Sequence, residues 1–262
     1  MKTTVFGCLV VFAIGIACSF AAVVYPPSPF EGKWRFDAVK STLTGTTVSV
    51  ASSGRNAWTF TYGSFSWTVK ADGSDQPTPF GTTVALKVGG PTTWEITNKS
   101  RDIITSTDTW VLADDNKSMT RTSSGAWENG RYFNSVVSMM RTAGDKGFEG
   151  TWESTEVKAA LPEVDIEAMG ISGLKIRIPT DARKLTLTFD GMIWLYAGPR
   201  IPVGLKASAR SAGPRKFIAT TELNDTVLDA ETWEVSADGK TLTFTERDIG
   251  QSKAIVSVFD KI

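Results

Sequence analysis

Apolar and polar residues alternate with a period of two through most of the chain, in short runs that turn residues separate. In residues 56–62, Trp58, Phe60 and Tyr62 alternate with small or polar residues. Such a run predicts a strand with one covered face and one open face. The run 65–70 repeats the alternation directly after a Gly-Ser pair, so the two runs are expected to form a hairpin.

Similar runs recur at intervals of about 8–12 residues through both halves of the chain, and helical periodicity is nearly missing. This spacing predicts an all-β protein with two tandem antiparallel up-and-down β-barrels of about eight to nine strands each. The segment Lys158–Gly173 departs from the pattern. It is expected to form either a short helix after Pro162 or a loop.

The chain carries one sequence pattern twice. Phe-Glu-Gly-Lys-Trp at 30–34 returns as Phe-Glu-Gly-Thr-Trp at 148–152, an offset of 118 positions (148 minus 30). The Thr-Trp pair at 109–110 returns at 232–233, an offset of 123 (233 minus 110). The difference places a five-residue insertion in the second copy, at the Pro- and Gly-rich stretch Gly198–Gly204. Loops absorb such length changes at little cost, so the two copies are expected to share one fold.

The repeat sets the expected domain boundaries. Residues 30–143 are expected to form the first barrel domain and residues 148–262 the second, joined by a short linker at 144–147. Residues 23–29 are rich in proline and predict an extended leader into the first domain.

The first 22 residues predict a secretory signal peptide. Lys2 precedes an apolar run from residue 5 to residue 17, and small residues around Ala21 suit cleavage by a signal peptidase. A secreted or periplasmic protein with no membrane span after cleavage follows from this interpretation. Two alternatives stay open, an uncleaved anchor and lipidation at Cys18.

Composition removes several classes of function. Lys plus Arg and Asp plus Glu number 28 each, so no global charge is available to attract nucleic acid. Histidine is absent, which excludes Ser-His-Asp catalysis and His-ligated metals. The only cysteines, Cys8 and Cys18, lie in the expected signal peptide. We therefore expect no enzymatic activity, no cofactor and no metal.

Carboxylates are the remaining catalytic possibility, because a glycosidase needs only a pair of them. Glu149 with Glu153, or Glu163 with Glu167, could supply such a pair. Their positions favour exposed surface residues. A carboxylate-based hydrolase would need two acidic side chains facing one cleft within about 5–10 Å of each other.

Gly-x-Trp at the start of each copy resembles the opening strand of lipocalins and related calycin barrels. The wider pattern, with a central Asp-Gly turn and the segment Val235–Phe244 before a closing apolar strand, is similar to small secreted bacterial lipocalin-like domains. The resemblance implies that Trp34 and Trp152 plug the closed ends of the barrels, each under a basic residue of the last strand. Arg141 is that residue in the first copy, and the second copy offers only Lys261.

The aromatic residues of the first copy are the candidate ligand-binding residues. They are Trp58, Phe60, Tyr62, Phe65, Trp67 and Trp94. Aromatic side chains in this pattern either line a cavity for a small apolar ligand or fill a solid core. The second copy has aliphatic residues such as Leu185 and Leu187 instead, so any ligand is expected in the first barrel.

Two hypotheses follow. The first is a secreted binding protein that holds a small apolar ligand in the first barrel. The alternative is a non-catalytic structural or protein-interaction module of the cell envelope or the extracellular space. An enclosed apolar void of several hundred cubic ångströms would favour the binding protein.

Overall fold

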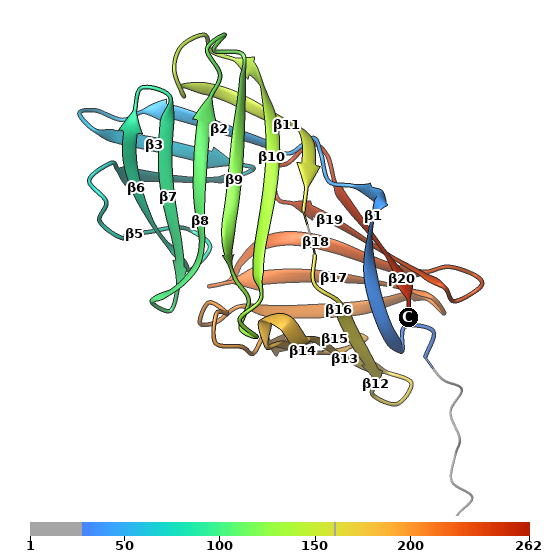
Figure 1. Cartoon of the computed structure of the whole chain (residues 1–262). Coiled ribbons are helices and arrows are strands. Elements are labelled where there is room, and N and C mark those ends of the chain that lie inside the picture. Colours follow the sequence, from blue (N-terminus) through green and yellow to red (C-terminus); the bar gives the residue numbers. More distant parts are fainter. Residues whose placement is uncertain (1–27, 160) are drawn as a thin grey trace, which may run out of the picture.

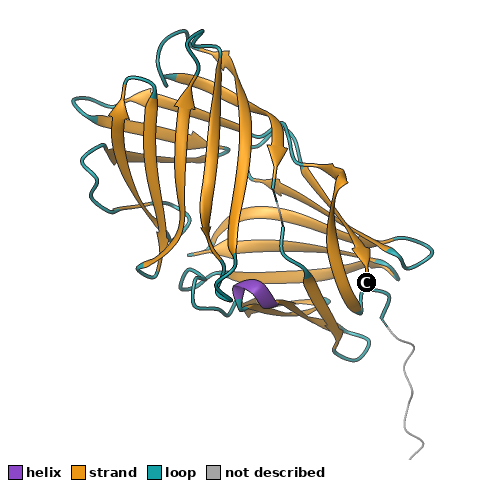
Figure 2. Cartoon of the chain, viewed as in Figure 1, coloured by secondary structure: helices purple, strands orange, loops and turns teal. Residues whose placement is uncertain are grey.

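The computed structural model describes residues 28–159 and 161–262. The predicted signal peptide, Cys18 and most of the proline-rich leader lie outside these residues. Twenty strands and one 3-10 turn (Pro179–Asp181) make up the regular structure of the described part (Figure 2). The strands form two antiparallel sheets of ten strands each, and each sheet curls into a nearly closed barrel. The predicted all-β fold with two barrels is confirmed, with slightly more strands per barrel than expected.

We call the two sheets the first and the second barrel (Figure 1). Around the first barrel the order is β4 (Phe65–Lys70), β3 (Ala57–Tyr62), β2 (Thr47–Ser52), β11 (Gly150–Lys158), β10 (Tyr132–Ala143), β9 (Ser118–Ala126), β8 (Ile103–Leu112), β7 (Thr93–Ser100), β6 (Thr83–Gly90) and β5 (Gln76–Pro77). Around the second it is β14 (Arg183–Thr188), β13 (Gly173–Ile178), β12 (Val164–Ala168), β1 (Gly32–Thr42), β20 (Ile255–Lys261), β19 (Thr241–Asp248), β18 (Thr226–Val235), β17 (Lys216–Leu223), β16 (Lys206–Gly213) and β15 (Asp190–Leu195).

The two barrels exchange their first strands. β1, the opening strand of the first sequence copy, pairs with β12 and β20 of the second barrel. β11, the opening strand of the second copy, pairs with β2 and β10 of the first barrel. The chain therefore crosses between barrels after β1 and again after β11. Residues 144–147, expected to link the domains, lie in the turn between β10 and β11, and the ranges 30–143 and 148–262 describe the sequence copies but not the barrels.

The repeated motif forms the closed end of each barrel. Trp34 and Trp152 are completely buried. Each indole N–H donates a hydrogen bond to the main-chain oxygen four residues earlier, at 2.9 Å in the case of Trp34 and 3.0 Å in the case of Trp152. Because of the exchange, the guanidinium of Arg141 lies 4.1 Å over the ring of Trp152, and the Lys261 ammonium lies 5.1 Å over Trp34. The expected cation over each tryptophan is present, but it comes from the other sequence copy.

The open ends of the barrels face each other. The turn between β3 and β4 contacts the loop between β19 and β20, where the Ser64 N–H donates to the Ile249 carbonyl at 2.8 Å. Gly63 has a φ of 57°, and a Cβ at this position would overlap the Ile249 carbonyl oxygen, so only glycine fits this contact. Gln251 bonds the main chain of Thr47 through both ends of its side-chain amide, at 2.9 and 2.8 Å. These contacts hold the two mouths together.

The segment Lys158–Gly173 corrects the expectation of a helix or a loop. Most of its central part is β12, which pairs with β1 and β13. Val164 and Ile166 are buried, whereas the acidic residues between and after them are partly exposed, as in a half-covered strand. The Pro- and Gly-rich insertion lies, as expected, in the loop between β15 and β16. Among the described residues, no helix has the length and apolar character that a membrane span requires.

Candidate functional site

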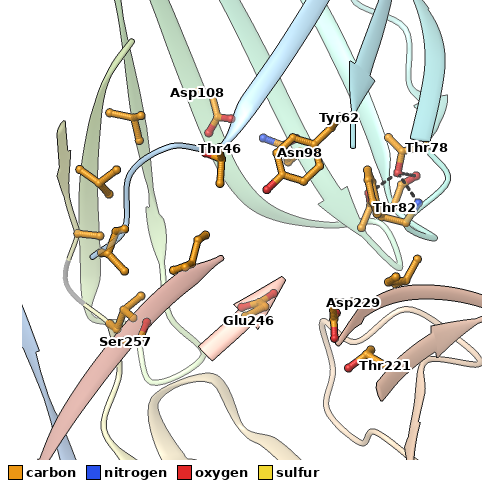
Figure 3. Close-up of a pocket in the computed structure, with 18 of the residues that line it drawn as sticks. Thr46, Tyr62, Thr78, Thr82, Asn98, Asp108, Thr221, Asp229, Glu246 and Ser257 are labelled. Carbon is orange, nitrogen blue, oxygen red and sulfur yellow. Dashed lines mark hydrogen bonds between the residues drawn. The ribbon is translucent and has the colours of Figure 1, made fainter. Parts of the chain in front are cut away.

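A cavity of about 940 Å³ lies between the open ends and is lined by both barrels (Figure 3). Most of its wall is apolar. The first barrel contributes Phe60, Trp67, Phe80 and Trp110, which we call the aromatic wall. The second barrel contributes Leu185, Trp233 and Phe244, among others. The volume lies in the range of sites that hold small organic molecules.

The predicted ligand-binding residues divide into two groups. Phe60, Tyr62 and Trp67 line the cavity. Trp58 and Trp94 pack inside the first barrel, where Trp94 stacks on Phe148 with 4.1 Å between ring centroids and Trp58 lies 4.8 Å from Trp94. Phe65, next to the turn that contacts the second barrel, lies 5.1 Å from Phe80 but does not line the cavity. The barrel is filled towards its plugged end and hollow towards its mouth. The alternation does not report position along the barrel axis, which separates Trp58 and Trp94 from the aromatic residues that line the cavity.

One buried acidic residue of the first barrel, Asp108, is fully paired. It is 3% exposed and forms an ion pair of 3.0 Å with Arg121. Its other oxygen accepts hydrogen bonds from Ser123 at 2.6 Å and from Ser106 at 3.2 Å. The charge in this half of the cavity is therefore balanced.

The second barrel brings three carboxylates to its half of the cavity, and a fourth, Asp248, lies beside them. Asp229 and Glu231 lie on β18, and Asp248 and Glu246 lie directly opposite them on β19. We call these four residues the acidic cluster. Alternate residues of a strand point to the same side, and cross-strand neighbours lie about 5 Å apart, so the pairing forces the four side chains together. Carboxylate oxygens of Asp229, Glu246 and Asp248 lie within 4.8 Å of one another.

The acidic cluster is only partly satisfied by hydrogen bonds. Glu231 accepts from the Trp233 indole at 2.8 Å and from the Thr221 hydroxyl at 3.2 Å. Asp248 accepts from the Tyr62 hydroxyl of the first barrel at 2.5 Å. Asp229 is 8% exposed, and its Oδ1 is buried without a hydrogen-bond partner. An oxygen of this kind is available to a bound molecule.

Arg183 acts electrostatically on Glu231 and Glu246 but does not neutralise the cluster. Arg183 on β14 lines the cavity, but its guanidinium forms an ion pair of 2.7 Å with Asp181, outside the cluster. Four carboxyl groups thus share the field of one arginine that already has a partner.

Burial and mutual repulsion shift the titration of the cluster. Burial, together with the charge of Glu231, raises the pKa of Asp229 to about 7. Burial, with the charges of Glu231 and Asp248, raises the pKa of Glu246 to about 8. Burial also raises the pKa of Glu231. The cluster consequently holds protons near neutral pH, and a cation placed among these oxygens would displace them.

The acidic cluster does not include any of the carboxylates expected from the sequence. Those lie elsewhere: Glu149 and Glu163 are exposed, Glu153 pairs with Lys253, and Glu167 pairs with Arg177. A usable signal was present in the strand 226–235. Asp229 and Glu231 have the same alternation phase as Trp233 and Val235, which marks them as inward-facing.

Comparisons with protein-family models, with curated proteins and with solved structures found no match to this chain.

Proposed function

We propose that the chain is a secreted or periplasmic binding protein in which two lipocalin-like barrels enclose one small, largely apolar molecule. The observation that carries this proposal is the 940 Å³ cavity with its predominantly apolar lining. Pockets of about 300–1,000 Å³ with mostly hydrophobic walls and a few polar groups are typical of small-molecule sites. A protein with a purely mechanical role has no use for such a void, because unfilled volume lowers stability.

The ligand extends beyond the first barrel. The aromatic wall supplies the flat, polarisable surface that the apolar body of a ligand packs against. The cavity continues into the second barrel, so the bound molecule contacts both sequence copies.

The alternative is a non-catalytic module that acts through its surface. One observation favours it: Met192, Ile193 and Leu195 on β15, at the edge of the second sheet, are more than half exposed. Exposed apolar side chains on one strand are typical of contact surfaces.

A third class, a carboxylate-based hydrolase, is supported by the close carboxylates but not by the walls around them. A sugar would need hydrogen-bonding partners along its length, and the walls on both sides of the cluster are mainly apolar.

The test is a titration with the neutral fluorophore N-phenyl-1-naphthylamine, combined with native mass spectrometry of the secreted protein. We expect saturable binding with one molecule per chain. Leu185→Trp, which puts an indole into the cavity, should abolish binding, and Ile218→Trp, on an exposed position of β17, should leave it intact. Absence of binding across a broad panel of apolar probes, together with no co-purified molecule, would overturn the proposal in favour of the surface module.

A further inference from the structure

A purely apolar ligand does not account for the acidic cluster. Four carboxyl groups at the end of an apolar cavity carry a penalty for desolvation, and nothing in the packing of the second barrel requires them there. The equivalent end of the cavity in the first barrel has one buried carboxylate, Asp108, which is paired with Arg121.

We infer that the ligand carries a positively charged amino group, which Asp229, Glu246 and Asp248 bind while its apolar body lies against the aromatic wall. The inference rests on the proposed function and names the chemistry of the ligand.

The spacing of the oxygens fits an ammonium group. Three oxygens at the corners of a triangle with sides of up to 4.8 Å can all be reached from one central point at about 2.8 Å. That is the usual length of a hydrogen bond from a charged nitrogen to a carboxylate. A primary ammonium has three N–H donors, one for each of the three side chains.

The partner pattern supports the same conclusion. Oδ1 of Asp229 is buried and makes no hydrogen bond, and Asp229 lines the cavity (Figure 3). Asp108, by contrast, has its arginine and two serine donors, so it offers no comparable acceptor. The amino group therefore belongs at the end of the cavity formed by the second barrel.

An organic cation fits better than a bare metal ion. Calcium takes six to eight oxygen ligands in typical protein sites, and a metal ion would leave most of the cavity volume empty. A molecule with an ammonium head and an apolar body fills the volume and neutralises the cluster.

The charged and titratable groups around the site come from several strands. They are Asp229, Glu231, Glu246 and Asp248 on β18 and β19, Arg183 on β14, Tyr62 on β3, Arg121 on β9, and Tyr196 after β15. Deprotonation of Asp229 and Glu246 between about pH 6 and pH 9 should strengthen binding of a primary alkylamine, which stays protonated over this range. Binding of an uncharged analogue should not change.

The experiment compares matched ligands. Decylamine and decanol are each tested for displacement of N-phenyl-1-naphthylamine from the full chain at pH 8. We expect decylamine to displace it at a concentration at least about tenfold below that of decanol. The ratio should fall to about one in Asp229→Asn/Glu246→Gln. It should be unchanged in Glu234→Gln, a matched control on the outer face of β18.

The outcomes separate the two proposals. Equal potency of decylamine and decanol in the parent protein overturns the inference and leaves the binding function standing. Failure of every probe to bind overturns both. Tight binding of calcium that the double variant loses, without preference for decylamine, identifies a metal site and also overturns the inference. If the double variant does not fold, the pH profile of the parent decides. Decylamine stays protonated from pH 6 to pH 9, and binding of decylamine that does not strengthen over this range counts against the amino group.

Discussion

The two halves of the cavity are built from equivalent strands of the two sequence copies but differ in charge. Asp108 and Glu231 occupy equivalent positions, 123 residues apart (231 minus 108). The residue opposite Asp108 is Ser123, and the residue opposite Glu231 is Glu246. The position of Arg121 in the first barrel is taken by Phe244 in the second, at the same offset. At the same offset, Ser106 and Gly125 correspond to Asp229 and Asp248. Four replacements on two strands therefore separate the neutral pair from the acidic cluster.

The closed ends differ much less. Both have a fully buried tryptophan, the same indole hydrogen bond to the main chain and a cation over the ring. The closed ends thus keep the same contacts in both barrels, whereas the inner walls near the mouths have diverged in charge.

The largest expected effect comes from removing a plug. Trp152→Ala should lower the free energy of unfolding by about 3–5 kcal/mol, because a large buried side chain is lost and a cavity is left. The strand exchange specifies where the damage appears. Hydrogen exchange should accelerate in β2–β10 and not in β12–β20, and Trp34→Ala should give the reverse pattern. Faster exchange in β12–β20 after Trp152→Ala would contradict the exchange of strands.

A smaller effect is expected from pH. Asp229 and Glu246 have raised pKa values in the folded protein, about 7 and 8, against 3.8 and 4.5 as ordinary values. The folded state therefore binds more protons than the unfolded state between about pH 4 and pH 8, and stability should fall as pH rises through this window. Asp229→Asn/Glu246→Gln should flatten the profile and be more stable than the parent at pH 8 by on the order of 2 kcal/mol. Urea unfolding at several pH values measures the free energy of unfolding, and Glu234→Gln should show the same pH dependence as the parent. If the double variant also shows the parent's pH dependence, the cluster does not cause it.

The smallest effect concerns the cations over the plugs. Arg141 also donates hydrogen bonds to the main-chain oxygens of Asn116, Gly147 and Glu149, and a lysine cannot reproduce this set. Arg141→Lys should therefore lower the free energy of unfolding by about 1 kcal/mol. Lys216→Arg, an exposed substitution on β17, serves as a control and should have no measurable effect. Equal stability of Arg141→Lys and the parent in urea would mean that these bonds contribute nothing.

Much of the fold follows from the sequence because it depends on local patterns. The alternation of residues 56–62 and 65–70 predicts the hairpin of β3 and β4, and the repeated motif places the plugs. The strand exchange does not follow, because β1 and β11 carry the same motif and either can complete either barrel. The short connections after β1 and β11 determine which barrel each of these strands joins. The alternation of apolar and polar residues does not indicate the direction that these connections take.

The candidate site was predictable only in part. Aromatic residues at alternate positions of a strand indicate its inward-facing side. Whether each fills the core, as Trp94 does, or lines the cavity, as Trp67 does, depends on its distance from the plug. The acidic cluster depends on the register of β18 against β19, which places four carboxylates together that lie up to 19 positions apart (248 minus 229). Asp229 and Glu231 alternate in step with the apolar residues of their strand, and this alone predicts that they face inward.

The location of β1 has a mechanical consequence. Its neighbour in the second barrel is β20, the last strand of the chain, and the two run antiparallel with Trp34 opposite Lys261. Both ends of the folded part are thus anchored side by side in one barrel. Pulling the ends apart would load the hydrogen bonds between β1 and β20 one after another, as in a zipper. The half of the cavity that carries the carboxylates would therefore open before any force reached the other half.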